Sequence, residues 1–281
     1  MPVCNGEQFI QQALDSLLAQ DYRHFELIIS DNASTDRTAN ICQSYAAKYA
    51  QVRYYRNEEN CGPVANFNRV LEYATGEYFM WAACDDVWEP TYICTMLKSL
   101  ASVKGSVLAF SAFDNIDEHG NQTRTYPELL NLLSQDPYTG LLNYMTQEEY
   151  LGKANLTYGL MRKETIEKAG GFKLWGGYWG CDMLVVFRIL LMGNMVIYPG
   201  ILFHKRLLSP EPKNKNLLRI LLRILDIPAT ISSYRRWHSY FSGYARIISL
   251  IDRLPESGKA RLQGALHTRA KQVYWRVLKG A

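Results

Sequence analysis

Residues 25–83 read FELIISDNASTDRTANICQSYAAKYAQVRYYRNEENCGPVANFNRVLEYATGEYFMWAA, and short apolar runs alternate there with segments of helical periodicity. The apolar runs suit buried strands and the periodic segments suit helices. We expect strands at Phe25–Ser30, Val52–Arg56 and Tyr78–Ala83, and helices that begin at Ser34 and span Pro63–Tyr73. This β–α–β–α–β order predicts an α/β protein whose open, mostly parallel sheet carries helices on both faces.

A further helix is expected ahead of this unit. Apolar side chains recur at helical spacing from Phe9 to Leu18, and Asn5 can cap the helix. A strand should precede such a helix, yet only residues 1–4 stand before it. We therefore expect the first strand of the sheet to be truncated.

The second half of the chain shows a more mixed pattern. We expect strands at Ser106–Asp114, Leu156–Arg162 and Met195–Phe203, a helix at Cys181–Met192, and a long loop over residues 126–145. Amphipathic helices follow, separated near Pro228 and at Pro255–Gly258. The pattern divides the chain into an α/β domain, residues 1–210, and a basic helical extension, residues 211–281.

Of the 281 residues, 48% are apolar and 21% are charged, a composition that excludes global disorder. The charge is distributed unevenly along the chain. Residues 1–210 hold 17 basic and 23 acidic side chains, whereas residues 211–281 hold 14 and 4, a net charge of +10. The extension is expected either to lie on an anionic membrane surface or to pack on the body of the protein or on a second subunit. Nucleic acid is not expected as a partner, because no recognised binding motif accompanies the charge.

The six cysteines contain no CxxC pair, and the chain begins without a secretory signal pattern. Free thiols in a reducing compartment follow from this, so we expect a cytoplasmic protein that is peripheral at most to the inner face of the membrane. The longest apolar run, Leu184–Phe203, is interrupted by Arg188, which argues against a spanning helix.

Two acidic sites follow predicted strands, where ligands of open α/β sheets collect. Asp85 and Asp86 come directly after YFMWAA and could hold a divalent cation shared with a phosphate, or form a solvated turn. Asp31 follows FELIIS and could accept hydrogen bonds from a base or ribose, or cap the next helix.

Two further positions could carry chemistry. Asp182 opens a predicted helix after a run of glycines and aromatics, where it could serve as a general base or only complement the helix dipole. His204 stands beside Lys205 and Arg206 and could reach a metal or phosphate, or belong to a basic surface turn.

Taken together, six stretches resemble the family 2 glycosyltransferases, which are inverting enzymes of the GT-A fold. The stretches are MPVCNGE, SLLAQDYRHFELIISDNASTDRT, RNEENCGPVANFN, ATGEYFMWAACDDVWEP, AGGF and the segment around GCDMLVVFRI, which occur in the family's order across residues 1–204. The resemblance implies a GT-A sheet and sugar transfer from a nucleotide diphosphate donor to an acceptor hydroxyl.

The resemblance also implies roles for individual residues on the donor side. The positions that match the family's nucleotide-sugar contacts are Val3, Cys4, Asp31, Asn68 and Asp85. Cys4 stands where many members have a tyrosine, which removes stacking surface from the nucleotide base. The implied donor is a UDP-sugar.

For the metal and the base, the resemblance implies Asp86 as the metal-binding carboxylate, with His204 approaching the ion, and Asp182 as the proposed base. The implied cofactor is Mn²⁺ or Mg²⁺. Many members carry another acid just before the Asp pair, where this chain has Ala83 and Cys84. Cys181 likewise replaces a glutamate that precedes the family's base.

The implied acceptor is a glycan or lipid-linked glycan in polysaccharide biosynthesis. Two alternatives stay open: a catalytically silent nucleotide-sugar-binding protein on the same fold, and a sugar nucleotidyltransferase. The second would normally show a glycine-rich, basic phosphate loop near the N-terminus, which this sequence lacks. A dinucleotide-dependent oxidoreductase is disfavoured because GxGxxG is absent.

Overall fold

A computed structural model describes residues 1–134, 136–173, 179–207, 227–252 and 254–278. Within these ranges the chain forms a three-stranded sheet, a six-stranded sheet and helices packed around both. The predicted α/β class is confirmed.

The first sheet is parallel throughout, in the order β1 (Pro2–Val3), β2 (Leu27–Asp31) and β3 (Val52–Arg56). All five residues of β2 are buried, as its continuous apolar run predicts. Helix α1 (Ile10–Leu18) buries Ile10 and Leu14 against this sheet region, and α2 (Thr38–Lys48) connects β2 to β3. The first strand has two residues.

The second sheet is mixed, which the expectation of a mostly parallel sheet did not anticipate. Its strand order is β4 (Tyr78–Phe79), β8 (Leu160–Arg162), β6 (Ser106–Ile116), β9 (Asn194–Arg206) and β5 (Val87–Trp88), with β7 (Gln122–Thr125) beside β6. Among these described strands only β6 and β9 run parallel, and their long pairing forms the centre of the sheet. The predicted strand Tyr78–Ala83 is shorter than expected, because only its first two residues join the ladder.

The remaining elements of the body are α3 (Pro63–Tyr73), α4 (Tyr92–Ser102), α5 (Pro137–Thr146), α6 (Lys163–Ala169) and α7 (Cys181–Leu190), with 3₁₀ turns at Pro127–Leu132, Glu149–Leu151 and Lys153–Tyr158. Helix α3 matches its predicted limits. The predicted loop at residues 126–145 is wrong, because a 3₁₀ turn and α5 occupy most of it.

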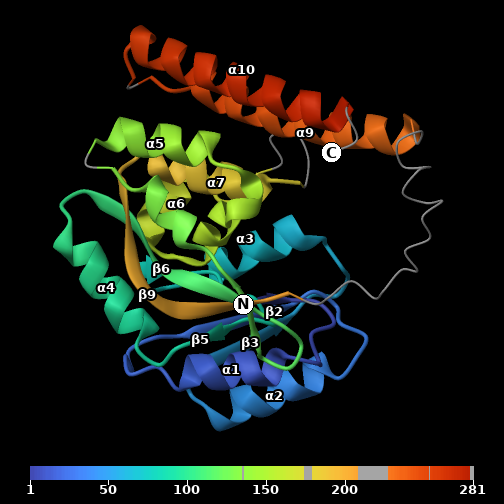
Figure 1. Cartoon of the computed structure of the whole chain (residues 1–281). Coiled ribbons are helices and arrows are strands. Elements are labelled where there is room, and N and C mark those ends of the chain that lie inside the picture. Colours follow the sequence, from blue (N-terminus) through green and yellow to red (C-terminus); the bar gives the residue numbers. More distant parts are fainter. Residues whose placement is uncertain (135, 174–178, 208–226, 253, 279–281) are drawn as a thin grey trace.

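Beyond the body, α9 (Ile227–Ser249) and α10 (Glu256–Leu278) form a helical hairpin. Figure 1 shows this hairpin lying over the side of the molecule that carries α5 and α7, away from α1 and α2. Tyr240, Tyr244 and Leu262 are among its buried side chains. These two helices of the extension therefore pack on the body of the protein, which was one of the expected alternatives. Residues 208–226, which include the predicted domain boundary and most of the extension expected before Pro228, lie outside the described residues.

An ion-pair network explains how part of the extension's positive charge is buried. Arg269 of α10 is only 3% exposed and forms two hydrogen bonds with the carboxylate of Glu148, at 2.7 and 2.8 Å. Its guanidinium also donates to Glu149 at 2.6 Å, and Glu149 accepts from the buried Lys153 at 3.2 Å. Because buried charges need partners, these acids of the body fix the place of α10.

No helix in the ranges described above is long and apolar enough to cross a bilayer.

Candidate functional site

The turn after β2 is organised by the carboxylate of Asp31, which is fully buried. It accepts hydrogen bonds from the Ser34 amide at 2.9 Å, the Tyr54 hydroxyl at 2.7 Å and the Arg56 guanidinium at 2.9 Å. Asp31 thus holds the turn after β2, but it does not cap the next helix, because α2 begins at Thr38. A contact with the nucleotide base stays a prediction.

The two N-terminal donor-site candidates border this turn. Val3 is buried and its carbonyl accepts the Asn32 amide at 2.8 Å, which ties β1 to the end of β2. Cys4 is exposed, and its Sγ accepts a hydrogen bond from the side-chain amide of Asn60 at 3.6 Å. Val3 pairs with Asp31 in the first sheet, so Val3, Cys4 and Asp31 lie at the same edge of it. The donor contacts that the resemblance implies for them stay a prediction.

Asn68 has a clear structural role. Its amide nitrogen donates to the Phe172 carbonyl at 3.0 Å, and its amide oxygen accepts the Phe172 N–H at 2.9 Å. A Cβ on Gly171, whose φ is +60°, would lie 2.7 Å from the Asn68 oxygen. Asn68 thus joins α3 to the Gly170–Phe172 turn, and its predicted nucleotide contact remains untested.

The Asp85–Asp86 pair lies where β4 leads into β5. The carboxylate of Asp86 is fully buried and accepts the ammonium of Lys205 at 3.0 and 3.1 Å and the amide of Arg206 at 2.9 Å. Burial raises the pKa of Asp86 to about 6, although Lys205 acts to lower it. Asp85 is half-buried, and no hydrogen bond from the described residues reaches its carboxylate.

His204 does not join Asp86. Its Nδ1 lies 2.6 Å from Asp114 and its Nε2 lies 3.0 Å from Glu89. Neighbouring residues of a strand point to opposite faces, so Lys205 reaches Asp86 while His204 turns the other way. The predicted pairing of Asp86 with His204 is not formed in this structure.

Asp182 stands in the first turn of α7 and is half-buried. Burial raises the pKa of its carboxyl group, while the Met183 amide, which donates to Oδ1 at 2.8 Å, acts to lower it. A carboxylate with a raised pKa is a better proton acceptor than an exposed one. The electrostatic setting therefore suits the predicted base.

Tyr158 connects the two acidic sites and was not predicted. Burial raises the pKa of its phenol, and Asp86, Asp182 and Asp85 raise it further, whereas Lys205 lowers it. The ammonium of Lys205 lies 5.2 Å from the centre of the Tyr158 ring. The hydroxyl of Thr157, the preceding residue, donates to the Asp182 carbonyl at 3.3 Å, so Tyr158 lies beside both the Lys205–Asp86 pair and the start of α7.

Gly180 allows α7 to present Asp182 beside the hairpin. Its φ is +77°, and an added Cβ would lie 2.5 Å from the ring of Tyr240 on α9. Tyr240 is buried and packs edge-to-face on Trp179 at 5.0 Å. Close approach and backbone geometry therefore both require glycine here.

We expect Gly180→Ala to destabilise the protein by about 2 kcal/mol, since it combines left-handed strain with overlap against a fixed ring. Gly264→Ala is the matched control, because Gly264 lies on an exposed part of α10 and an added methyl group there would have no atom within 4 Å. That change should stabilise the protein by about 0.5–1 kcal/mol. Chemical denaturation measures both, and equal effects would contradict the argument.

The donor atoms around Asp86 do not fit a divalent cation. Mg²⁺ and Mn²⁺ take several oxygen ligands, yet Ala83 and Cys84 stand before the Asp pair and Lys205 occupies both Asp86 oxygens. The thiol of Cys84 is a soft ligand, whereas Mg²⁺ and Mn²⁺ prefer oxygen. No group of three His, Cys, Asp or Glu side chains with metal-binding geometry occurs among the described residues.

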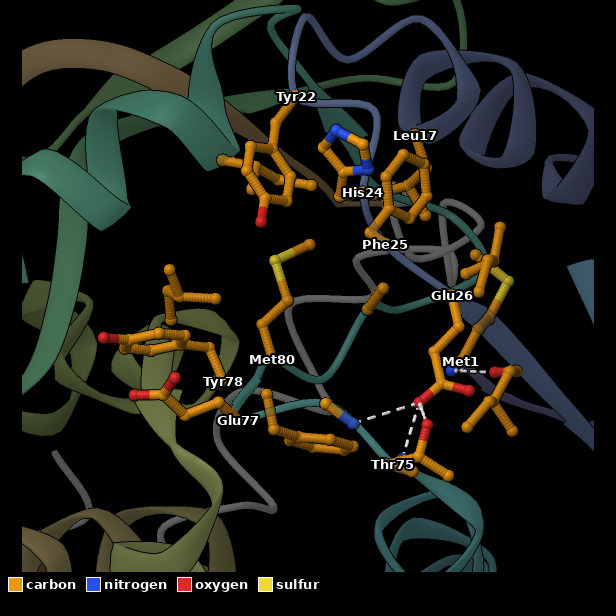
Figure 2. A pocket seen from close by; sticks show the side chains of 18 of the residues that line it. Met1, Leu17, Tyr22, His24, Phe25, Glu26, Thr75, Glu77, Tyr78 and Met80 are labelled. Atoms are coloured by element: carbon orange, nitrogen blue, oxygen red, sulfur yellow. Dashed lines mark hydrogen bonds between the residues drawn. The ribbon is translucent and has the colours of Figure 1, made fainter. Parts of the chain in front are cut away.

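A cavity of ≈ 580 Å³ lies elsewhere, between β2 and β4. Figure 2 shows it lined by Leu17, Phe25 and Met80, with Glu26 held by hydrogen bonds to Thr75 at its edge. Neither the Asp pair nor Asp182 lines it. Its lining mixes apolar side chains with charged and polar ones, such as His24 and Glu77, and it lies beside the start of β2. It therefore does not contribute to the site of the Asp pair.

Comparisons with known proteins identify the family of the chain. Residues 1–161 match the glycosyl transferase family 2. The chain belongs to this family. Among the relatives of this chain, the uncharacterized glycosyltransferase RT0329 of Rickettsia typhi is 31% identical over 119 residues, which are 42% of this chain and 36% of that protein. The uncharacterized protein Rv1520 of Mycobacterium tuberculosis is 37% identical over 128 residues, 44% of this chain and 37% of that protein.

Solved structures share the GT-A fold of family 2. Staphylococcus aureus TarS 1–349 has a TM-score of 0.69 at 16% identity, with 96% of this chain and 70% of that chain covered. The mannosyltransferase PcManGT of Pyrobaculum calidifontis, solved with GDP-Man and Mn²⁺, has a TM-score of 0.59 at 18% identity, with 99% and 72% covered. The matched stretches span little more than a third of the two curated relatives' own lengths.

Proposed function

We propose that this family 2 chain transfers a sugar from a nucleotide diphosphate donor to a hydroxyl of a glycan acceptor, with inversion at the anomeric carbon. The observation that supports it is the arrangement around Tyr158. Lys205 bonds to Asp86, just before β5, and its ammonium lies 5.2 Å from the centre of the Tyr158 ring. The carbonyl of Asp182, at the start of α7, accepts the hydroxyl of the neighbouring Thr157. This arrangement suits a donor bound near the Asp85–Asp86 pair and an acceptor bound near Asp182.

In the proposed reaction, the carboxylate of Asp182 accepts the proton of the acceptor hydroxyl. The hydroxyl oxygen attacks the anomeric carbon, and the bond from that carbon to the diphosphate oxygen breaks. The leaving diphosphate takes the electron pair. Holding donor and acceptor on rigid elements lowers the entropic part of the barrier. Val3, Cys4, Asp31, Asn68 and Asp85 remain the proposed donor contacts.

We infer a UDP-sugar as the donor, because TarS of the same fold has been solved with UDP and with UDP-GlcNAc. PcManGT, solved with GDP-Man, makes a GDP-sugar the second candidate. PcManGT also contains Mn²⁺. In this chain the residues around Asp86 do not fit such an ion, so no step of the proposed reaction depends on a metal.

A thermal-shift comparison tests the donor assignment. UDP-GlcNAc and GDP-mannose are each added to the whole chain, with uridine as the control that lacks phosphates. A ligand at 100 times its Kd stabilises the folded state by about 2.7 kcal/mol. We expect one nucleotide-sugar to raise the melting temperature and uridine to leave it unchanged. Equal melting temperatures in all samples would contradict the proposal, and binding without release of nucleotide diphosphate would favour the silent binding protein.

We place the reaction in glycan or polysaccharide biosynthesis at the cytoplasmic face of a membrane, with a glycan or lipid-linked acceptor. The outer side of α10 supports this, since it exposes Lys271 together with Trp275 and Leu278. Basic and aromatic side chains of this kind suit an interface with anionic lipid. Flotation of the whole chain with phosphatidylglycerol vesicles, compared with neutral vesicles, checks this placement, and equal recovery would contradict it.

A further inference from the structure

The carboxylate of Asp86 already has a cation. The Nζ atom of Lys205 lies 3.1 Å from Oδ1 and 3.0 Å from Oδ2, and the Asp86 side chain is fully buried. The Arg206 amide also donates to Oδ1 at 2.9 Å. Both oxygens that a metal would use are therefore occupied by groups of this chain.

A divalent ion at Asp86 would compete directly with Lys205. An ion bound to both carboxylate oxygens would lie close to the position of Nζ, and two positive charges so close together repel each other strongly. Few other ligands could offset this cost, because Ala83 and Cys84 provide no carboxylate and His204 bonds to Asp114. Lys205 and a metal are thus alternatives at this carboxylate.

The position of Lys205 is fixed by its surroundings. Its side chain is 18% exposed, and the ammonium lies 5.2 Å from the Tyr158 ring centre. The Asp86 carboxylate and the face of that ring both favour a positive charge at this place.

An ammonium has three N–H donors. The two hydrogen bonds that Lys205 forms with the described residues both go to Asp86. One N–H therefore remains to donate to a ligand, and the partly exposed side chain can be reached from solvent.

Arg206 adds a second positive charge. Among the described residues, its guanidinium donates hydrogen bonds to carbonyl and amide oxygens and to no carboxylate. Its nitrogen atoms donate to the carbonyls of Asp85 and Asp117, at 2.9 and 2.6 Å, and to the Gln12 amide oxygen at 2.6 Å. The side chain is 2% exposed. Arg206 thus fixes the Asp85–Asp86 turn to the end of β9 and makes the region more favourable for an anion.

We propose that Lys205 is the built-in cation of this site: its ammonium, positioned by Asp86, takes the place of a divalent metal and donates to the diphosphate of the donor. The proposal rests on the proposed function. The diphosphate gains negative charge when the bond to the anomeric carbon breaks, and a fixed ammonium stabilises that charge. Lys205 would then contact the substrate, and Asp86 would be a positioning residue.

Calorimetric titration with UDP tests this on the whole chain, in EDTA and in Mn²⁺. We expect the wild-type chain to bind UDP with affinities that agree within about twofold under the two conditions, which is below the effect of one hydrogen bond. Lys205→Met should weaken binding in EDTA by about tenfold or more, because a charge-assisted hydrogen bond is lost. Lys205→Arg, which keeps the charge, should retain more of the metal-independent binding than Lys205→Met.

Lys163→Met is the matched control. Lys163 is also about one-fifth exposed, at 21%, and also pairs with an acid, Glu167, at 3.1 Å, but it lies on α6. Its loss should leave the UDP affinity unchanged. The wild-type comparison needs no variant, so it decides the question even where Lys205→Met fails to fold.

Three results would overturn the inference. Wild-type binding that needs Mn²⁺ would show that a metal occupies the site, and the proposed function would stand. Undiminished UDP affinity of folded Lys205→Met in EDTA would remove the lysine from the donor site. Absence of binding for UDP and for UDP-GlcNAc under both conditions would overturn the UDP-donor assignment as well.

Discussion

Asp182→Asn is expected to reduce sugar transfer by about 10³-fold while leaving UDP affinity within about twofold of the wild-type value. The amide keeps the size of the side chain and its acceptor for the Met183 amide, but it cannot take up a proton. The donor-side residues lie at the ends of other elements, so binding of the nucleotide should persist. Transfer is measured as release of UDP in the presence of acceptor, and affinity by calorimetry.

Asp21→Asn is the control for this substitution. Asp21 is exposed in the loop before β2, at the opposite end of that strand from Asp31. Its loss should leave transfer unchanged. A transfer rate in Asp182→Asn equal to that of Asp21→Asn would exclude Asp182 as the base.

The pH profile gives a second readout for the same residue. Only the ionised carboxylate accepts a proton, so transfer should fall as the pH drops through the pKa of Asp182. Burial raises that pKa, so the fall should occur at a higher pH than for an exposed aspartate. Asp182→Asn should lack this part of the profile in its residual activity.

Local signals explain why some elements could be predicted closely. Helix α3 begins with Pro63 after Gly62, whose φ is +80°, and ends at Tyr73 as predicted. Proline is favoured in the first turn of a helix because its missing N–H is not needed there. Strand β3 also keeps its predicted limits, Val52–Arg56. In both cases a short stretch of sequence contains the information.

The missed helix α5 also had a local signal. Asp136 caps it by accepting the Thr139 amide at 2.9 Å, and Pro137 occupies the first turn. An aspartate followed by proline is a typical helix start. The mixed direction of the second sheet, by contrast, depends on contacts between distant segments and has no such signal. The pairing of β6 with β9 joins residues about 90 positions apart.

Some features of the candidate site could likewise be predicted from local sequence, and others could not. Asp31, Asp85, Asp86 and Asp182 could be proposed because each is an acid next to a predicted strand or helix. The ion pair of Asp86 with Lys205 spans 119 positions and depends on the register of β5 against β9, in which Val87 pairs with His204. A shift of that register by one residue would exchange the faces of His204 and Lys205. The choice between these two side chains could therefore not be made from sequence.

The second large effect is expected in the hairpin, where two arginines share one carboxylate. Arg269→Gln should lower the free energy of unfolding by about 3 kcal/mol, because it breaks a buried ion pair and leaves acids of the network undercompensated. Arg276→Gln should cost less than about 1 kcal/mol, since exposed pairs are screened by solvent. The two side chains are 3% and 48% exposed, and both form two hydrogen bonds with Glu148. Chemical denaturation of the whole chain measures both.

Comparing Arg269 with Arg276 distinguishes the effect of charge on stability from the effect of burial. Hydrogen bonds from Arg276 are the largest cause that lowers the pKa of Glu148, to about 2, while burial opposes the shift and Arg269 lowers it further. If charge alone decided stability, Arg276→Gln would be the more damaging change. We expect the reverse, because only Arg269 also holds Glu149 and is shielded from water. Equal losses for the two variants would show that burial does not set the strength of these ion pairs, and negligible losses for both would show that the ion pairs do not fix the place of α10.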